Sequence, residues 1–256
     1  GRMSVRLGSG RDYWVATEGL VDVTRGGREE ESAEVATNTK RLRFSTANAA
    51  VVVVDMQNYF IHPEGRKRTT TEPPPGLALV EPLNAVIDAA REHRMPIVWV
   101  NWGNREDSLG LPPSLLHSFA VAPGTEDQCP AGYKPNVLVK GSWEAAVYDG
   151  LHKQPGDAFV DKQRISGCFH SQLDDVLRSL GRQTLFFAGV NTDQCVMGTL
   201  IDASNRGYDC VLMEDCTAST SPDFVVRGCL FNLNLCYGFS TLGSRVVEAL
   251  QHAGKK

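Results

Sequence analysis

Three side chains of this 256-residue sequence have the chemistry of a nucleophilic active site. Asp55, Lys162 and Cys195 each follow closely after a short apolar run. An ionised thiol attacks carbonyl carbons, a carboxylate can accept the proton of that thiol, and an ammonium group stabilises the negative charges involved. Their combination predicts covalent catalysis by Cys195, provided that the fold brings the three side chains together.

Cys195 is the candidate nucleophile. Thr192 is the expected N-cap of the next helix, which places Cys195 in the first helical turn. Free N–H groups and the helix dipole favour a thiolate there, and they lower a cysteine pKa below its usual value of about 8.5. We therefore expect an ionised sulfur that faces an open cleft beside one carboxylate and one ammonium. The alternative is a buried structural cysteine, which packs as a small hydrophobic residue.

The elements that would position these groups alternate between strands and helices. Apolar residues with helical spacing separate runs that are apolar throughout, the pattern of buried parallel strands. This alternation predicts an α/β fold of three α-β-α layers around a mainly parallel sheet, which binds ligands beyond the carboxyl ends of its strands. The strand runs are 49–54, 97–100, 158–160, 184–188 and 210–213, and the helical segments are 77–93, 173–180, 196–205 and 222–235.

The first 45 residues differ from the rest of the chain. Segments 13–16 and 20–23 are typical of a short hairpin, and the polar stretch 26–32 is typical of a linker. Because this part has too few apolar residues for a core of its own, we expect an N-terminal arm at 1–45 and one domain at 46–252. The Gly- and Pro-rich segment 103–142 is predicted to be a long loop over the active-site edge.

Composition limits the class of protein. A hydrophobic content of 42% and a charged content of 22% are typical of a soluble globular chain. A net charge of −4 gives no support for a nucleic-acid or anionic-membrane partner. No apolar run is long enough to span a bilayer, and the first ten residues have no apolar signal segment. The seven cysteines form no CxxC pair and no zinc spacing, so we expect a cytoplasmic protein without metal or cofactor.

Three segments of the chain resemble the isochorismatase-like cysteine hydrolases. The resemblance extends over roughly 48–250, nearly all of the predicted domain, and implies a catalytic triad of Asp55, Lys162 and Cys195. It also implies a cis peptide bond between Val190 and Asn191, and an oxyanion hole formed by the backbone N–H groups of Asn191 and Cys195. The three segments are Val51–Asn58, Asp161–Phe169 and Gly189–Val196.

The resemblance implies hydrolysis of a C–N bond in a small amide or ureido acid, through a thioester-type intermediate. The family's metal-binding nicotinamidases carry an Asp-Trp-His segment after the second strand, and this chain does not. A homo-oligomer is expected, as is usual in this family. Lys140 is a further candidate, for a substrate carboxylate. The residues expected to contact the substrate are Asn101, Trp102, Asn104, Phe60, Ile165 and Phe169.

Two alternative functions stay open. An enzyme of the same fold could hydrolyse an isochorismate-like vinyl ether, a reaction that needs no thiol nucleophile, so the presence of Cys195 argues against it. A non-catalytic binding or redox-sensing module could use Cys195 only as a reactive thiol. An acyl group trapped on Cys195 would distinguish catalysis from this second alternative.

Overall fold

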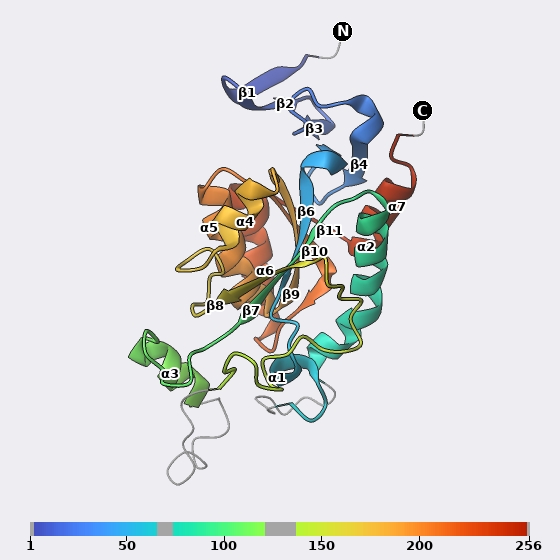
Figure 1. The fold of residues 1–256 in the computed structure, drawn as a ribbon. Coiled ribbons are helices and arrows are strands. Elements are labelled where there is room, and N and C mark those ends of the chain that lie inside the picture. Colours follow the sequence, from blue (N-terminus) through green and yellow to red (C-terminus); the bar gives the residue numbers. More distant parts are fainter. Residues whose placement is uncertain (1–2, 66–73, 121–136, 255–256) are drawn as a thin grey trace.

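A six-stranded sheet forms the centre of the molecule. The computed structural model describes residues 3–65, 74–120 and 137–254, and Figure 1 shows this sheet between two layers of helices. The strand order is β11-β10-β9-β6-β7-β8, and every neighbouring pair is parallel. The predicted α/β class with a mainly parallel sheet is confirmed.

The apolar runs of the sequence predict five of the six strands. The exception is the three-residue strand β11, in which two of the residues are polar. Strand β8 extends to Lys162, so this lysine ends the strand and does not follow it. The strands are β6 (Ala49–Val54), β7 (Ile97–Trp102), β8 (Ala158–Lys162), β9 (Thr184–Val190), β10 (Asp209–Ala218) and β11 (Phe239–Thr241).

Helices cover both faces of the sheet (Figure 1). Successive residues of a strand point to opposite faces, so β6 contributes to two separate cores. Val53 packs in the core that includes Leu83 of α2, and Val52 packs in the core that includes Leu200 of α5. One face carries α2 (Val80–Glu92) and α7 (Gly243–Gln251), and the other carries α4 (Leu173–Ser179), α5 (Met197–Asn205) and α6 (Asp223–Asn232). The short helices α1 (Asn58–Ile61) and α3 (Pro113–Ala120) belong to the connections.

The N-terminal residues form a second sheet that is larger than the predicted hairpin. Its order is β1-β2-β3-β5-β4, and β2 and β3 pair antiparallel. The segment expected to be a linker contains a short 3-10 helix and leads into β4. Phe44 of β5 packs against Phe186 of the central sheet, with ring centroids 4.8 Å apart, so the two sheets share a core. The strands are β1 (Val5–Ser9), β2 (Asp12–Ala16), β3 (Leu20–Asp22), β4 (Ser32–Ala36) and β5 (Arg41–Ser45).

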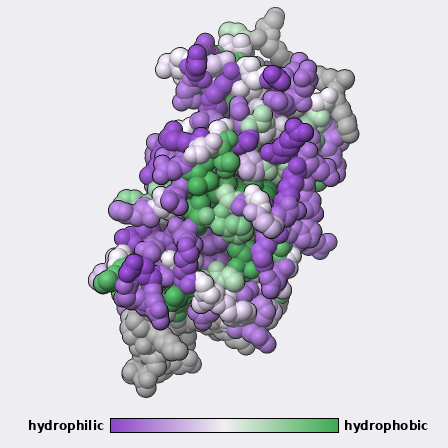
Figure 2. Space-filling model, in the orientation of Figure 1, coloured by the Kyte–Doolittle hydropathy of each residue, from purple (hydrophilic) through white to green (hydrophobic). Residues whose placement is uncertain are grey.

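The surface in Figure 2 is mainly hydrophilic, and hydrophobic residues gather near the middle of the face shown. The edge strand β8 runs across this area in Figure 1. Phe159 of β8 is 53% exposed and stacks on Trp99 of β7. Among the described residues, no helix combines the length and the apolar character needed to cross a membrane.

Candidate active site

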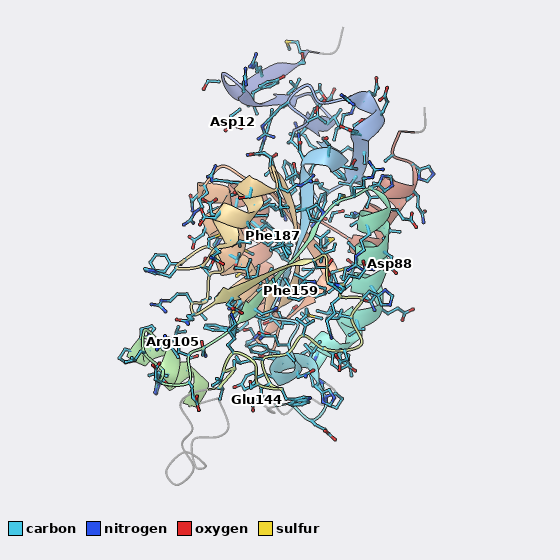
Figure 3. The ribbon with its side chains drawn as sticks, viewed as in Figure 1. Asp12, Asp88, Arg105, Glu144, Phe159 and Phe187 are labelled. Carbon is cyan, nitrogen blue, oxygen red and sulfur yellow. The ribbon has the colours of Figure 1, made fainter. Side chains whose placement is uncertain are left out.

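The three candidate residues meet at the carboxyl-terminal edge of the central sheet. Strands β6 and β9 are neighbours, so the turns that follow them, which carry Asp55 and Cys195, leave the sheet side by side. Lys162 ends β8, and its side chain crosses the end of β7 to reach them. Figure 3 marks Arg105 and Glu144 in the loops at this end of the molecule, opposite the N-terminal sheet.

The ammonium group of Lys162 contacts both of the other candidates. Its Nζ lies 3.0 Å from Oδ2 of Asp55 and 3.4 Å from Sγ of Cys195. The carboxylate of Asp55 also lies close enough to the thiol of Cys195 to raise its pKa. The side chains of Asp55 and Lys162 are completely buried. The fold therefore brings the predicted acid, amine and thiol into one water-excluded cluster.

Two further groups hold the ammonium in place. Nζ of Lys162 donates a hydrogen bond of 3.1 Å to the carbonyl oxygen of Arg164, and it lies 3.5 Å from the centre of the Trp102 ring. An aromatic face attracts a cation most strongly where water is excluded. Neither contact could be predicted from the residue pattern, beyond the general rule that a buried charge needs partners.

Gln57 fixes the end of strand β7. Its side-chain amide donates to the carbonyl of Trp102 at 2.8 Å and accepts from the N–H of Trp102 at 2.9 Å. The same NH₂ group donates to the carbonyl of Ala145 at 2.7 Å. These bonds fix the backbone of Trp102, the residue whose ring contacts Lys162.

Close approach of β9 to β6 sets the spacing of Asp55 and Cys195. Gly189 has a φ of 115°, and a Cβ atom there would collide with the carbonyl oxygen of Val54, so the position requires glycine. Asp55 has a φ of 54°, a left-handed conformation that aspartate adopts more readily than most residues. Its N–H donates to the carbonyl of Val100 at 2.9 Å, which ties the turn to β7.

Cys195 lies in a π-helical turn, Thr192–Val196, that leads into α5. The N-cap is Asn191 and not Thr192, and it makes no side-chain capping bond. The peptide bond between Val190 and Asn191 is cis, as the family resemblance implies. Cys195 is only 6% exposed, so it does not face an open cleft as expected.

Burial reverses the expected ionisation of Cys195. Loss of water raises the thiol pKa to about 12, the charge of Lys162 lowers it, and the charge of Asp55 raises it. The expectation of an ionised sulfur is therefore wrong for the resting protein, in which the thiol is neutral. Burial also raises the pKa of Asp55, against the opposing effects of Lys162 and of the hydrogen bond with Cys195. A raised pKa makes Asp55 a stronger proton acceptor than an ordinary aspartate.

The polar residues predicted to contact substrate are all buried. Trp102 is 1% exposed and lies against Lys162. Asn104 donates from its side chain to the carbonyl of Val137 at 2.8 Å, which commits its NH₂ group to the neighbouring loop. Oδ1 of Asn101 is buried and has no hydrogen-bond partner among the described residues. Oδ1 of Asn104 is likewise buried without a hydrogen-bond partner among the described residues, so both asparagines keep a free acceptor near the end of β7.

The apolar candidates are more accessible. Ile165 is 39% exposed and Phe169 is 51% exposed, whereas Phe60 is partly buried and packs against both cores. A Cβ atom placed on Gly198 would lie 3.3 Å from Cγ2 of Ile165, so Ile165 rests against the first turn of α5. This contact brings Ile165 close to the helix that follows Cys195.

Lys140 forms a 2.5 Å ion pair with Asp161, and both side chains are exposed. Within the described part of the chain, no three His, Cys, Asp or Glu side chains are grouped so that they could hold a metal ion.

Comparisons with known proteins find a family model and several solved structures that are similar to this chain. Residues 49–239 match the model of the isochorismatase domain. A cysteine hydrolase from Pseudomonas syringae pv. phaseolicola 1448A is 25% identical, with a TM-score of 0.66 over 82% of this chain and 95% of that one. An N-carbamoylsarcosine amidase from Thermoplasma acidophilum is 27% identical, with a TM-score of 0.59 over 77% of this chain and 96% of that one. An isochorismatase-like hydrolase from Alkaliphilus metalliredigens, 24% identical, shares the fold with a TM-score of 0.64 over 79% of this chain and 98% of that one.

Proposed function

Because the chain belongs to the isochorismatase family of hydrolases, we propose that it is a cysteine-dependent amidohydrolase that cleaves a C–N bond of a small amide or ureido acid. One observation carries the proposal: a single buried ammonium, that of Lys162, contacts both the carboxylate of Asp55 and the thiol of Cys195. The similarity to an N-carbamoylsarcosine amidase supports ureido compounds as the substrate class.

The first half of the reaction forms the acyl-enzyme. Asp55 takes the proton from the thiol of Cys195, and the sulfur attacks the substrate carbonyl carbon. Backbone N–H groups of Asn191 and Cys195 stabilise the resulting oxyanion. Asp55 then returns the proton to the leaving nitrogen, the C–N bond breaks, and ammonia or an amine departs.

The second half regenerates the thiol. Asp55 accepts a proton from a water molecule, the oxygen of this water attacks the thioester carbon, and the C–S bond breaks. The proton on Asp55 returns to the sulfur, and the product is an acid or a carbamate. Lys162 faces one anionic partner throughout, because the negative charge moves between the carboxylate and the sulfur or the oxyanion. This constant pairing is the reason for placing an ammonium between the two groups.

A finer substrate proposal comes from the sequence around the site. Segments Lys140–Trp143 and Gln154–Asp157 resemble ureidoacrylate amidohydrolase, an enzyme of pyrimidine breakdown. Ile165 stands where that enzyme has an aromatic residue, and the loop that begins at Asn101 is arranged differently. A ureidoacrylate-like compound is therefore the first substrate to test, with other ureido acids beside it.

The test is ammonia release from a panel of small carboxamides and ureido acids. The wild-type protein is expected to turn over at least one ureido acid, and Cys195→Ala and Cys195→Ser are expected to keep the fold and lose turnover. Mass spectrometry of the quenched reaction should find the acyl group on Cys195. Retained activity in either variant would overturn covalent catalysis by this thiol. An intact protein that hydrolyses only a vinyl ether, with no mass added to Cys195, would favour the isochorismatase-type alternative.

A further inference from the structure

We propose that Thr199 is a positioning residue that holds the nucleophile Cys195 at its distance from Lys162. This inference rests on the proposed function. Thr199 lies in α5 and is completely buried. Its hydroxyl donates to the carbonyl of Cys195 at 2.7 Å and accepts from the N–H of Gly167 at 2.8 Å. One hydroxyl thus joins the turn that carries the nucleophile to the segment that follows Lys162.

That segment also contacts the ammonium group. The carbonyl of Arg164 accepts a hydrogen bond from Nζ of Lys162, and Gly167 follows in the same segment. A Cβ atom on Gly167 would lie 2.5 Å from Val100 and 3.3 Å from Thr199, so the backbone here packs directly on its neighbours. The segment and the nucleophile turn are therefore held together at a close and specific contact.

An ordinary helical role accounts for only half of this arrangement. Threonine side chains in helices often donate to the carbonyl four residues earlier, as Thr199 does to Cys195. This common helical bond does not explain the second one, which comes from the N–H of Gly167 outside the helix. Without the hydroxyl, the N–H of Gly167 and the carbonyl of Cys195 would both lose a buried partner, and unsatisfied buried groups are costly.

The consequence for chemistry follows from the charge on Lys162. This charge lowers the pKa of the Cys195 thiol, in opposition to burial. If the turn and the segment separate, the sulfur moves away from the ammonium and its pKa rises further. Fewer molecules then hold the thiolate, and attack on the carbonyl slows. Binding of the substrate, which precedes this step, is affected much less.

The experiment compares Thr199→Val with Thr199→Ser in the full chain. Valine keeps the shape and removes the hydroxyl, and serine keeps the hydroxyl. We expect kcat of Thr199→Val on the active ureido acid to fall between about 10-fold and 100-fold, the range that a small misplacement of a reacting group produces. KM should stay within about twofold, because a loss confined to the reacting state lowers kcat and not binding. Thr199→Ser should restore most of the rate.

A second measurement does not depend on turnover. Labelling of Cys195 by iodoacetamide reports the thiolate fraction, so at each pH below the thiol pKa the rate should be lower in Thr199→Val, a shift of the profile to higher pH, and should return in Thr199→Ser. If no amide is hydrolysed but this shift is present, the proposed function fails while the positioning role stands.

The matched control is Thr241→Val. Thr241 is also buried, and its hydroxyl donates to the carbonyl of Ala36 at 2.6 Å. Ala36 ends β4 of the N-terminal sheet, and Thr241 is distant in the sequence from the three residues of the triad. The Thr241→Val protein should lose stability with no change in kcat or in the labelling of Cys195. A Thr199→Val protein that behaves in the same way would overturn the proposal.

If Thr199→Val does not fold, Thr199→Cys, with a weaker donor, must show a reduced kcat and a shifted labelling profile. Wild-type values in that variant would also overturn it.

Discussion

The ammonium of Lys162 lies 3.0 Å from the carboxylate of Asp55, and neither side chain is exposed to solvent. Removing two charges from water is costly, and replacement by apolar residues is often neutral or stabilising. The carbonyl of Arg164 and the ring of Trp102 surround the ammonium, but they do not explain why a charge is there. A buried pair beside a thiol is explained better by chemistry than by stability.

Replacing Lys162 by Met should impair both folding and catalysis. The carboxylate of Asp55 would remain buried without its cation, and loss of one partner of a buried pair costs about 3–5 kcal/mol. This loss should shrink at acidic pH, because protonation of Asp55 removes the unpaired charge. Urea unfolding at several pH values measures the first effect, and ammonia release measures the second.

A surface lysine provides the control for this change. Lys153 pairs with Asp149, whose side chain is 95% exposed, and Lys153→Met should alter neither the unfolding transition nor turnover measurably. Full activity of Lys162→Met on the same substrate would contradict the role proposed for Lys162.

Replacing Asp55 by Asn should make Cys195 easier to label while abolishing hydrolysis. The negative charge of Asp55 and its hydrogen bond both raise the thiol pKa, so their removal lowers this pKa and increases the thiolate fraction at any pH below it. Iodoacetamide labelling of the wild-type protein should keep rising with pH toward a pKa of about 12, and the variant should reach its plateau at lower pH. Turnover should still be lost, because asparagine cannot accept the thiol proton.

Slower labelling of Asp55→Asn than of the wild-type protein, at every pH, would contradict this assignment of charges. The Cys195→Ala protein defines the background, since any label on it reports the other cysteines.

Replacing Ile165 by Ala should change substrate preference without changing the thiol. Ile165 is 39% exposed and rests against the first turn of α5, which makes it a candidate for the pocket wall. Removal of apolar contacts from a pocket shifts discrimination between related substrates by roughly 10–200-fold per methylene-sized change. The ratio of kcat/KM for short and long ureido acids measures this shift. Leu180→Ala, at a similarly exposed apolar position, is the control, and an equal effect there would remove Ile165 from the pocket.

The fold could be predicted from the sequence where strands are buried on both faces. Strand β6 is an unbroken apolar run because helices cover both of its sides. Strand β11 left no such signal, since its three residues include Ser240 and Thr241. The N-terminal sheet was also underestimated, because β4 and β5 alternate polar and apolar residues and only one face of each reaches the shared core. A single-faced strand beside a glycine-containing stretch is easily interpreted as a linker.

The three residues of the site could be predicted from the sequence, but the protonation of Cys195 could not. Asp55, Lys162 and Cys195 follow apolar runs that mark strand ends, and parallel strands end at one edge. The protonation of Cys195 could not be predicted, because it depends on the balance between burial and two opposite charges. The position of Trp102 beneath Lys162 depends on how far β7 extends, and the apolar run alone ends before it.

Replacing Asp209 by Asn should destabilise the protein and leave the active site intact. The carboxylate of Asp209 is buried and accepts hydrogen bonds from Arg25 at 2.7 and 2.8 Å and from Trp14 at 2.7 Å, so it joins the N-terminal sheet to β10. Asparagine keeps the shape but leaves the guanidinium of Arg25 without its buried anion, at a cost of about 3 kcal/mol in the free energy of unfolding. Urea unfolding measures this loss.

Asp12→Asn, which removes the other carboxylate on Arg25 at a 74% exposed site, should cost far less. Because Asp209 begins β10, at the edge opposite the triad, kcat of the folded variant should equal that of the wild-type protein. Equal losses for the two aspartate variants would contradict the role of Asp209 as the buried link between the sheets.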